Sequence, residues 1–460
     1  MISDKKRQFF GTDGIRGKAN TEPLTPETAL RLGQAAALTL LEEQEAGDWP
    51  SIVVGRDTRA SGSMLEGALA AGMASVGVDV QLAGVIPTPG VAFLTKQLGA
   101  SAGAVISASH NPFHDNGIKF FGADGFKLTD ATELAIEEQL LSSARIEDEA
   151  RAIPAKIGKI APLENALDDY VGSVVASASS DAQFLKGVTV AFDAANGAGF
   201  QSGPAILEHF GADVRAHFVE PNGLNINVDC GATHPETIEQ IVKDEGAKVG
   251  VVLDGDADRI VMCDETGSAL DGDELMAIAA THFSKRGELT HNSIVATVMS
   301  NFGLNETLTE LGGKVVRAGV GDRYVVEELR KHRLEIGGEQ SGHLLFLNHS
   351  TTGDGMLAAV QILQIMAAEG KPLSELRKCL KKYPQAKRYL TVKSKPPLEE
   401  LTRANELIAE TEQTLSSLGR ILLRYSGTEP MIRLLIEGRD EAFINAAADR
   451  IADALIEQIG

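Results

Sequence analysis

The sequence predicts an α/β protein with three similar α/β domains, each with a mixed sheet, and a C-terminal α+β domain. Short apolar runs that suit strands alternate with helical patterns through most of the chain, which is typical of α/β architecture. The order of these elements recurs three times, which indicates an internal repeat. The chain has 460 residues, which is too many for one hydrophobic core, so several domains are expected.

Each copy of the repeat begins with a strand and later ends another strand in a polar loop. The first strands lie in SIVVGRDTRASG (51–62), GVTVAFDAANGAG (187–199) and SIVATVMSNFG (293–303). The polar loops are SASHNP (107–112), DGDADR (254–259) and GEQSGH (338–343). In open α/β sheets, ligands bind beyond the carboxyl ends of the strands, so the three loops could face one shared cleft.

The first two copies align closely. GASAGAVISAS (99–109) sets against GAKVGVVLDGD (246–256), which places Ser107 opposite Asp254 and Ser109 opposite Asp256. Because α/β units resemble one another in general, the pattern alone leaves the repeat as a hypothesis.

A Lys- and Pro-rich segment, KKYPQAKRYLTVKSKPPLEE (381–400), is interpreted as a domain boundary. The tail (401–460) has two amphipathic helical stretches around the strands RILLRYSG and MIRLLIEG, which predicts a small α+β domain. The expected domains are 1–165 with the SASHNP loop, 166–263 with the DGDADR loop, 264–382 with the GEQSGH loop, and 383–460.

Charge and composition limit the partners. Lys and Arg total 43 and Asp and Glu total 64, a net charge of −21, which repels nucleic acid and anionic membranes. No apolar run reaches the ~18 residues of a membrane span, and the first residues lack the apolar stretch of a secretory signal. The three cysteines are scattered, without disulfide or zinc spacing. These features predict a cytoplasmic protein with a small-molecule partner; a homodimer is compatible with them.

The DGDADR loop predicts a cation site. Alternate residues of an extended segment point the same way, so Asp254, Asp256 and Asp258 can converge on Mg²⁺ or Ca²⁺. An EF-hand is excluded because strands flank the loop and Arg259 stands where that motif needs glycine. An aspartate-nucleophile phosphatase and a plain acidic turn stay open. Three like charges this close repel one another without a cation, which favours a metal.

The SASHNP loop offers a serine that could carry a phosphoryl group. A nucleophilic serine needs a base or a metal to activate it, and there is no GxSxG motif here, so a triad esterase is not supported. A phosphate on Ser109 would need neutralisation, and the repeat puts the Asp triplet in the corresponding loop. From these residues alone, a polar turn ended by Pro112 is the favoured interpretation.

Three further loops carry polar groups that suit a sugar phosphate, although each could be an ordinary turn. LLRYSGTEPMIR (422–433) combines hydroxyls, a glycine and guanidinium groups, which suits a phosphate. GEQSGH offers carboxylate, hydroxyl and imidazole groups, and FGTDGIRG (10–17) offers an arginine between glycines. The candidate residues are Arg424, Ser426, Gly427, Thr428 and Arg433; Glu339, Ser341 and His343; and Arg16.

In this order, the motifs resemble the α-D-phosphohexomutase superfamily, from Phe10 to about Glu437. The resemblance is carried by FGTDGIRG, ISASHNPFHDNGIKFF (106–121), VGDRYV (320–325), TTGDG (351–355) and RYSGTEPMIR (424–433). It implies four domains around a central cleft, the fourth being a mobile lid. The bacterial amino-sugar mutases are the most similar branch.

The resemblance also implies a reaction. Ser109 matches the phosphoserine of the family, and its phosphate with Asp254, Asp256 and Asp258 would hold one Mg²⁺. The phosphoserine would convert glucosamine 6-phosphate through a bound 1,6-bisphosphate into glucosamine 1-phosphate, feeding UDP-N-acetylglucosamine and cell-wall synthesis. A hexose 1,6-bisphosphate would act as activator.

Other roles are carried over in the same way. Glu339 and Ser341 would grip sugar hydroxyls, and Arg424, Ser426, Gly427 and Thr428 would hold the phosphate that does not react. Lys119 matches a general base of relatives, with His110 and Arg16 as further candidates for proton transfer and charge stabilisation. Arg259, His343 and Arg433 complete the expected substrate-binding set.

Three alternatives stay open. A phosphomannomutase or phosphoglucomutase would use the same mechanism, and Gln340 stands where other members have Asn or Met. An aspartate-nucleophile phosphatase would carry its phosphate on Asp254. A sugar-phosphate binder without catalysis would need no nucleophile.

Overall fold

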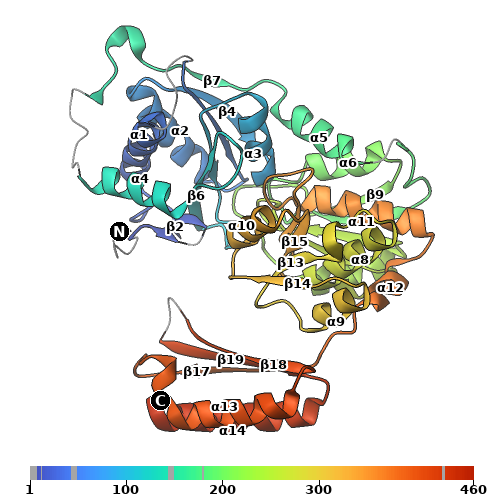
Figure 1. The fold of residues 1–460 in the computed structure, drawn as a ribbon. Coiled ribbons are helices and arrows are strands. Elements are labelled where there is room, and N and C mark those ends of the chain that lie inside the picture. Colours follow the sequence, from blue (N-terminus) through green and yellow to red (C-terminus); the bar gives the residue numbers. More distant parts are fainter. Residues whose placement is uncertain (1–7, 12, 43–48, 143–149, 179–180, 427–429) are drawn as a thin grey trace. The chain divides into compact units, whose positions relative to one another are not determined.

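The computed structural model describes residues 8–11, 13–42, 49–142, 150–178, 181–426 and 430–460 (Figure 1). The chain forms two compact units. The first comprises the described residues up to Met299 together with Val315–Lys378, and the second comprises Ser300–Lys314 with Cys379–Gly460.

The first unit contains three sheets that share one four-strand pattern. The first sheet has the order β6 (Asp115–Gly122), β5 (Ala102–Ile106), β3 (Ser51–Arg56), β4 (Asp79–Val85). The second has β11 (Ile260–Cys263), β10 (Val249–Leu253), β8 (Thr189–Asp193), β9 (Asp213–His217). The third has β16 (Leu344–Phe346), β15 (Ile336–Gly338), β13 (Ile294–Thr297), β14 (Val315–Ala318). In each, the last three strands are parallel and the first is antiparallel, which confirms the three similar α/β domains with mixed sheets.

Two of these sheets carry additional strands. The first sheet is extended by β1 (Phe10–Gly11) and β2 (Gly14–Lys18) beside β6, and by β7 (Ile160–Pro162) beside β4. The second sheet is extended by β12 (Ala269–Leu270), which lies beyond the expected boundary after residue 263. The four domain boundaries otherwise stay predictions.

The helices of the first unit connect and cover these strands. They are α1 (Pro26–Glu42), α2 (Gly62–Ser75), α3 (Thr88–Gln97), α4 (Asp130–Ser142), α5 (Ala166–Ala176), α6 (Ser202–His209), α7 (Pro235–Glu245), α8 (Gly272–Lys285), α10 (Asp322–His332), α11 (Gly355–Glu369) and α12 (Leu373–Leu376). Helices α1 and α2 pack closely because a glycine of each helix lies against the backbone of the other. A Cβ at Gly33 would lie 2.2 Å from the Leu69 carbonyl oxygen, and one at Gly72 would lie 2.0 Å from that of Leu30.

The burial of the central strands explains why their apolar runs could be recognised in the sequence. All five residues of β5 and all five of β10 are buried, as expected for parallel strands covered by helices. Each of these strands ends at one of the predicted polar loops. None of the described helices is long and apolar enough to cross a bilayer.

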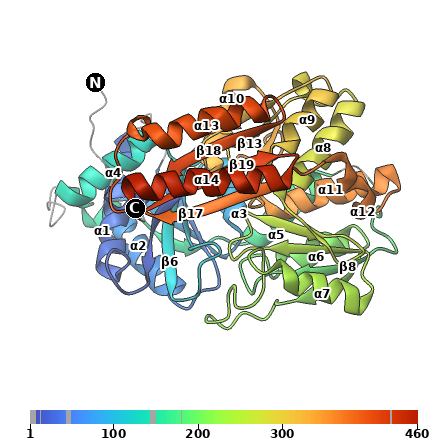
Figure 2. The same cartoon turned by 90° about the horizontal axis from the view of Figure 1, so that it is seen from below.

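The second unit is an antiparallel sheet with helices. Its strands have the order β17 (Gln385–Thr391), β19 (Met431–Gly438), β18 (Gly419–Tyr425). The helices are α9 (Gly303–Glu310), α13 (Thr402–Leu415) and α14 (Glu441–Ile459), and Figure 2 shows α13 and α14 side by side. The interpretation of 381–400 as a domain boundary stays a prediction, and this segment contains a full strand, β17. Its Lys and Tyr side chains are exposed, and Ala386 faces the core.

Candidate active site

The structure brings the serine loop and the acidic loop together. Ser109 follows β5 and Asp254 follows β10, so both stand at the carboxyl end of a central parallel strand. The Ser109 Oγ donates a hydrogen bond of 2.5 Å to Asp254 Oδ2, and both residues are buried. The sequence alignment set Ser109 opposite Asp256, but alignment relates equivalent positions in two domains, whereas contact depends on how the loops approach each other.

Ser109 is held in an unusual backbone conformation. Its φ of +51° lies in the left-handed region, which residues other than glycine seldom adopt. The Ser107 hydroxyl accepts a hydrogen bond of 2.9 Å from the Ser109 N–H and donates one of 2.6 Å to Asp57 Oδ2. The first serine of SASHNP therefore supports the second.

The three aspartates form a buried cluster. One oxygen from each of Asp254, Asp256 and Asp258 lies within 4.8 Å of the others. Asp256 Oδ2 accepts hydrogen bonds from Lys119 Nζ (2.6 Å) and Thr88 Oγ1 (2.7 Å), whereas its Oδ1 is buried without a hydrogen-bond partner among the described residues. A hard divalent cation fits this donor set because it would supply the missing partner and relieve the repulsion between carboxylates.

The ionisation of the cluster reflects its crowding. Burial, followed by the neighbouring Asp256 and Asp258 charges, raises the pKa of Asp254 to about 7. Burial also acts to raise the pKa of Asp258, but His343 and Lys119 outweigh it and hold that pKa well below its usual value. The cluster is therefore short of positive charge on the side of Asp254, which faces Ser109.

Lys119 lies on β6 and contacts two of the aspartates, at 2.6 Å to Asp256 and 3.4 Å to Asp258. Burial acts to lower its pKa, but Asp13, Asp256 and Asp258 raise the pKa well above that of a free lysine. An ammonium group in this place suits charge neutralisation or proton donation better than proton abstraction. The general-base role stays a prediction.

The other two candidates for proton transfer lie beside the serine loop. His110 Nδ1 is 3.3 Å from the Ser109 Oγ. Burial, together with the Arg259 and Arg16 charges, lowers the pKa of His110 to about 4, so its imidazole is neutral and can accept a proton. Arg16 lies on β2 and forms an ion pair with Asp13.

The GEQSGH loop is connected to the acidic cluster through one histidine. His343 Nδ1 is 2.8 Å from Glu339 Oε2, and its Nε2 is 3.0 Å from Asp258 Oδ1. Although burial lowers it, the Asp258 carboxylate raises the pKa of His343 to about 10. Arg259 belongs to the same group, since its Nε lies 3.2 Å from His343 Nε2 and its backbone N–H donates to Asp254 Oδ1 at 3.2 Å. Ser341 lies exposed on the turn, open to a ligand.

The predicted phosphate loop belongs to the second unit. Arg424, near the end of β18, pairs in register with Arg433 on β19, and the buried Ser426 follows β18. Gly427 and Thr428 lie outside the described residues. Lys395 Nζ donates to the Ser426 carbonyl oxygen at 2.6 Å, which adds a cation that the sequence interpretation missed.

Other contributors were also missed. Thr88 begins α3, and Asp57, Arg59 and Asn227 surround the serine loop. The only signal was GRDTR (55–59), in which two arginines and an aspartate follow an apolar strand.

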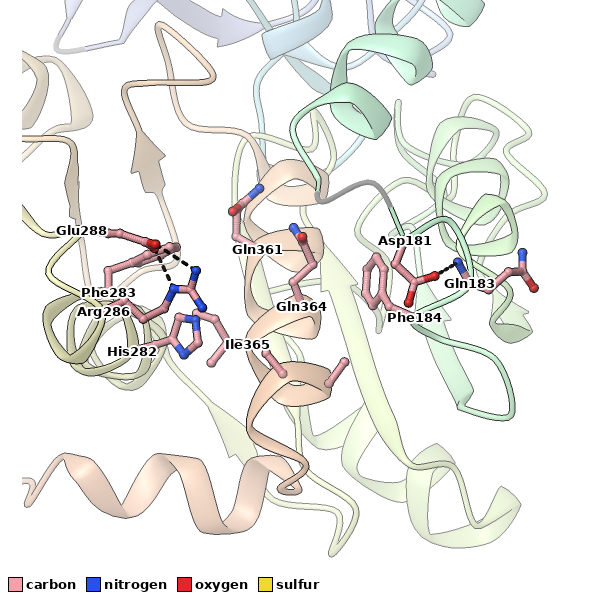
Figure 3. A pocket seen from close by; sticks show the side chains of 12 residues that line it. Asp181, Gln183, Phe184, His282, Phe283, Arg286, Glu288, Gln361, Gln364 and Ile365 are labelled. Carbon is pink, nitrogen blue, oxygen red and sulfur yellow. Dashed lines mark hydrogen bonds and ion pairs between the residues drawn. The ribbon is translucent and has the colours of Figure 1, made fainter.

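A pocket of about 550 Å³ lies elsewhere in the first unit, between α8, α11 and the segment before β8 (Figure 3). Its lining includes Phe184, His282 and Arg286, and Arg286 is paired with Glu288 at 2.9 Å. None of the predicted site residues lines it. The Ser109 and aspartate cluster is the better candidate because it combines a buried hydroxyl with carboxylates that can hold a cation.

Comparison with known proteins shows which sequences and folds the chain resembles. Sequence profiles described as phosphoglucomutase/phosphomannomutase match four stretches: alpha/beta/alpha domain I over residues 7–146, domain II over 168–267, domain III over 271–383 and the C-terminal domain over 368–454.

Individual relatives match over almost the whole chain. The phosphoglucosamine mutase of Syntrophotalea carbinolica is 47% identical over 455 residues, covering 99% of this chain and 98% of that protein. That of Myxococcus xanthus is 49% identical over 449 residues, covering 98% and 97%. The crystal structure of a phosphoglucomutase/phosphomannomutase family protein from Burkholderia thailandensis superposes with a TM-score of 0.79 at 23% identity, covering 97% and 96%, so it shares the fold.

Proposed function

Because the chain belongs to the phosphoglucomutase/phosphomannomutase family of α-D-phosphohexomutases, we propose that it is a phosphoglucosamine mutase, an isomerase that interconverts glucosamine 6-phosphate and glucosamine 1-phosphate. Relatives of that name match it at 47–49% identity over nearly the whole chain, which supports this substrate. The observation that carries the proposal is the buried Ser109 hydroxyl, 2.5 Å from Asp254 at the acidic cluster.

Ser109 carries the phosphoryl group in this proposal. The bond from phosphorus to Ser109 Oγ breaks as a bond to O1 of glucosamine 6-phosphate forms; the O1 hydroxyl loses its proton and Ser109 Oγ gains one. The bound 1,6-bisphosphate turns around and its 6-phosphoryl group returns to Ser109 Oγ, which loses its proton as O6 gains one. Neutral His110, 3.3 Å from Ser109 Oγ, and the Lys119 ammonium are the groups placed to accept and donate these protons.

Asp254, Asp256 and Asp258, with the phosphate on Ser109, would hold one Mg²⁺. When bound, this ion would neutralise charge on the transferring phosphoryl group. The unpartnered Asp256 Oδ1 and the clustering of the carboxylate oxygens within 4.8 Å support the assignment.

The remaining loops bind and orient the sugar phosphate. Glu339 and Ser341 contact sugar hydroxyls, and His343, which Arg259 contacts, links Glu339 to the acidic cluster. Arg424, Ser426, Gly427, Thr428 and Arg433 bind the phosphate that does not react. The partner is a small sugar phosphate, a hexose 1,6-bisphosphate is the activator, and the enzyme acts in the cytoplasm.

The test is a mutase assay with glucosamine 6-phosphate, mannose 6-phosphate and glucose 6-phosphate, with and without glucose 1,6-bisphosphate. We expect the highest kcat/KM for glucosamine 6-phosphate and stimulation by the bisphosphate. A clear preference for mannose 6-phosphate would assign a sibling activity instead. Peptide mapping of the phosphorylated protein should find the phosphate on Ser109; phosphate on Asp254 would contradict the mechanism.

A further inference from the structure

Arg59 has no part in the proposed reaction, yet its side chain is fully buried beside the serine loop. A guanidinium group has five N–H donors, and here they meet five acceptors. The acceptors are Asp57 Oδ2 (2.8 Å) for Nε, the Pro112 and Asp115 (3.0 Å) carbonyls for Nη1, and the Ser109 (2.8 Å) and Asn111 (2.8 Å) carbonyls for Nη2. Four backbone carbonyls between residues 109 and 115 therefore bind one side chain.

A second chain of hydrogen bonds returns from Arg59 to Ser109. Asp57 accepts from the Arg59 backbone N–H (2.9 Å) and from the Ser107 hydroxyl (2.6 Å). Ser107 in turn accepts from the Ser109 N–H at 2.9 Å. Ser109 is thus fixed through both its N–H and its carbonyl, which stabilises its left-handed backbone and determines the direction of its side chain.

The domain of the second sheet, which carries the acidic loop, contributes to the same network. Asn227 Nδ2 donates to the Ser109 carbonyl (2.9 Å) and to the Asn111 carbonyl (3.0 Å). The backbone around Arg59 is also joined to that domain, since Thr58 Oγ1 donates to the Asn196 carbonyl at 2.6 Å. Gly255, between two of the aspartates, has no room for a side chain, because a Cβ there would lie 2.5 Å from the Ser109 carbonyl oxygen.

We propose that Arg59, Asp57 and Asn227 are positioning residues that fix the Ser109 hydroxyl relative to the acidic cluster for phosphoryl transfer. The inference rests on the proposed function. Arg59 is not an anion-binding arginine, because all of its donors are occupied by Asp57 and backbone carbonyls. Phosphoryl transfer depends chiefly on positioning and charge stabilisation, so a small displacement of Ser109 slows the reaction without altering substrate contacts.

The experiment measures phosphorylation of Ser109 directly. Dephosphorylated full-length protein is mixed with Mg²⁺ and glucose 1,6-bisphosphate, and intact mass is followed in a rapid quench. The variants are Arg59→Lys and Asn227→Ala. The matched control is Arg56→Lys at the end of β3, three residues before Arg59. The Nε of Arg56 pairs with Glu66 at 3.2 Å. The rate constant and the final phosphorylated fraction are recorded separately, together with kcat and KM for glucosamine 6-phosphate.

A positioning role lowers the rate constant while the folded protein still becomes fully phosphorylated. We expect losses of about 100-fold for Arg59→Lys and about tenfold for Asn227→Ala in rate constant and kcat, with KM within about twofold and the control unchanged. A purely structural role predicts a smaller phosphorylated fraction at an unchanged rate constant, and that result would overturn the inference.

The outcomes separate this inference from the function on which it rests. If wild-type protein is phosphorylated on Ser109 but both variants match its rate constant, only the positioning role is wrong. If wild-type protein is not phosphorylated on Ser109, the proposed mechanism fails and the inference fails with it. If Arg59→Lys does not fold, Asn227→Ala decides, because that side chain lies at the margin of the network with 9% of its surface exposed.

Discussion

The serine loop (107–112) and the acidic loop (254–259) occupy the same place in two similar sheets, yet the hydrogen-bonding of their polar groups differs. Each follows a fully buried strand, and each contains a residue with positive φ, Ser109 at +51° and Ala257 at +60°. In the serine loop, Arg59 and Asn227 bind the backbone carbonyls, and the Ser109 hydroxyl points to Asp254. In the acidic loop, carboxylates crowd together, and Asp256 Oδ1 has no hydrogen-bond partner within the part of the chain that the structure describes.

In the proposed mechanism, this difference lets one topology supply two parts of a reaction. The strand ends fix where the loops stand, and the loop residues decide whether a loop carries a group or stabilises charge. The backbone of the acidic loop is supported by a helix end. The Gly355 N–H, at the start of α11, donates to the Ala257 carbonyl at 3.0 Å, and Asp354 caps that helix by accepting from the Leu357 N–H at 3.0 Å.

The largest expected effect comes from the serine loop. Ser109→Ala removes the phosphoryl carrier, so turnover of glucosamine 6-phosphate should fall by more than about 1,000-fold, to the limit of the assay. Far-UV circular dichroism should be unchanged. The matched control is Ser101→Ala, just before β5, which should retain activity. The Ser101 hydroxyl accepts a hydrogen bond from the Ser51 N–H at 3.3 Å. An active Ser109→Ala enzyme would remove the distinction between carrier and charge-stabilising loop.

The acidic loop should give the next largest effect. Asp256→Asn removes a carboxylate, so we expect kcat to fall by about 100-fold and Mg²⁺ binding measured by calorimetry to weaken. The control is Asp244→Asn, which removes an exposed charge from the same domain. A variant that keeps more than about a tenth of the wild-type rate, under about 1.4 kcal/mol of barrier, would contradict the metal-binding role.

The sequence predicted the sheets and the two loops because their signals are local. Apolar runs such as AGAVI mark buried strands, and alternate aspartates mark a cation site. It did not predict Arg59, which lies 50 residues before Ser109, because only the folded arrangement brings its donors to those carbonyls. Strand β17 was not predicted for another reason: its Lys387 and Tyr389 side chains are exposed at a sheet edge, so the Lys- and Pro-rich composition suggested a domain boundary.

A smaller effect concerns the support of the acidic loop. Burial raises the pKa of Asp354 from 3.8 to about 6, against the hydrogen bonds from Leu357 N–H and the Tyr170 hydroxyl. The folded state therefore binds more protons than the unfolded state between about pH 4 and 6, and the contribution of Asp354 to stability is lost as pH rises through this window. Asp354→Asn keeps an N-cap acceptor but does not titrate.

The free energies of unfolding of the wild-type protein and of Asp354→Asn should consequently diverge as the pH changes. Between pH 4 and pH 7 the difference should move in favour of Asp354→Asn by on the order of 3 kcal/mol, measured by urea denaturation. The control is Asp440→Asn, which replaces the exposed N-cap of α14 in the second unit. Parallel pH profiles for wild type and Asp354→Asn would show that Asp354 is not a buried, titrating support of the loop.

The smallest effect tests whether the third loop, GEQSGH, belongs with the two it resembles. Ser341 is exposed, whereas Glu339 and His343 are buried in contacts that reach the acidic loop. Ser341→Ala should therefore raise KM for glucosamine 6-phosphate by about threefold, the effect of losing one hydrogen bond to a neutral group, with kcat nearly unchanged. Ser374→Ala, outside the proposed substrate-binding set, is the control. A fall in kcat without a change in KM would mean that this loop acts in the transfer step itself, as proposed for the other two.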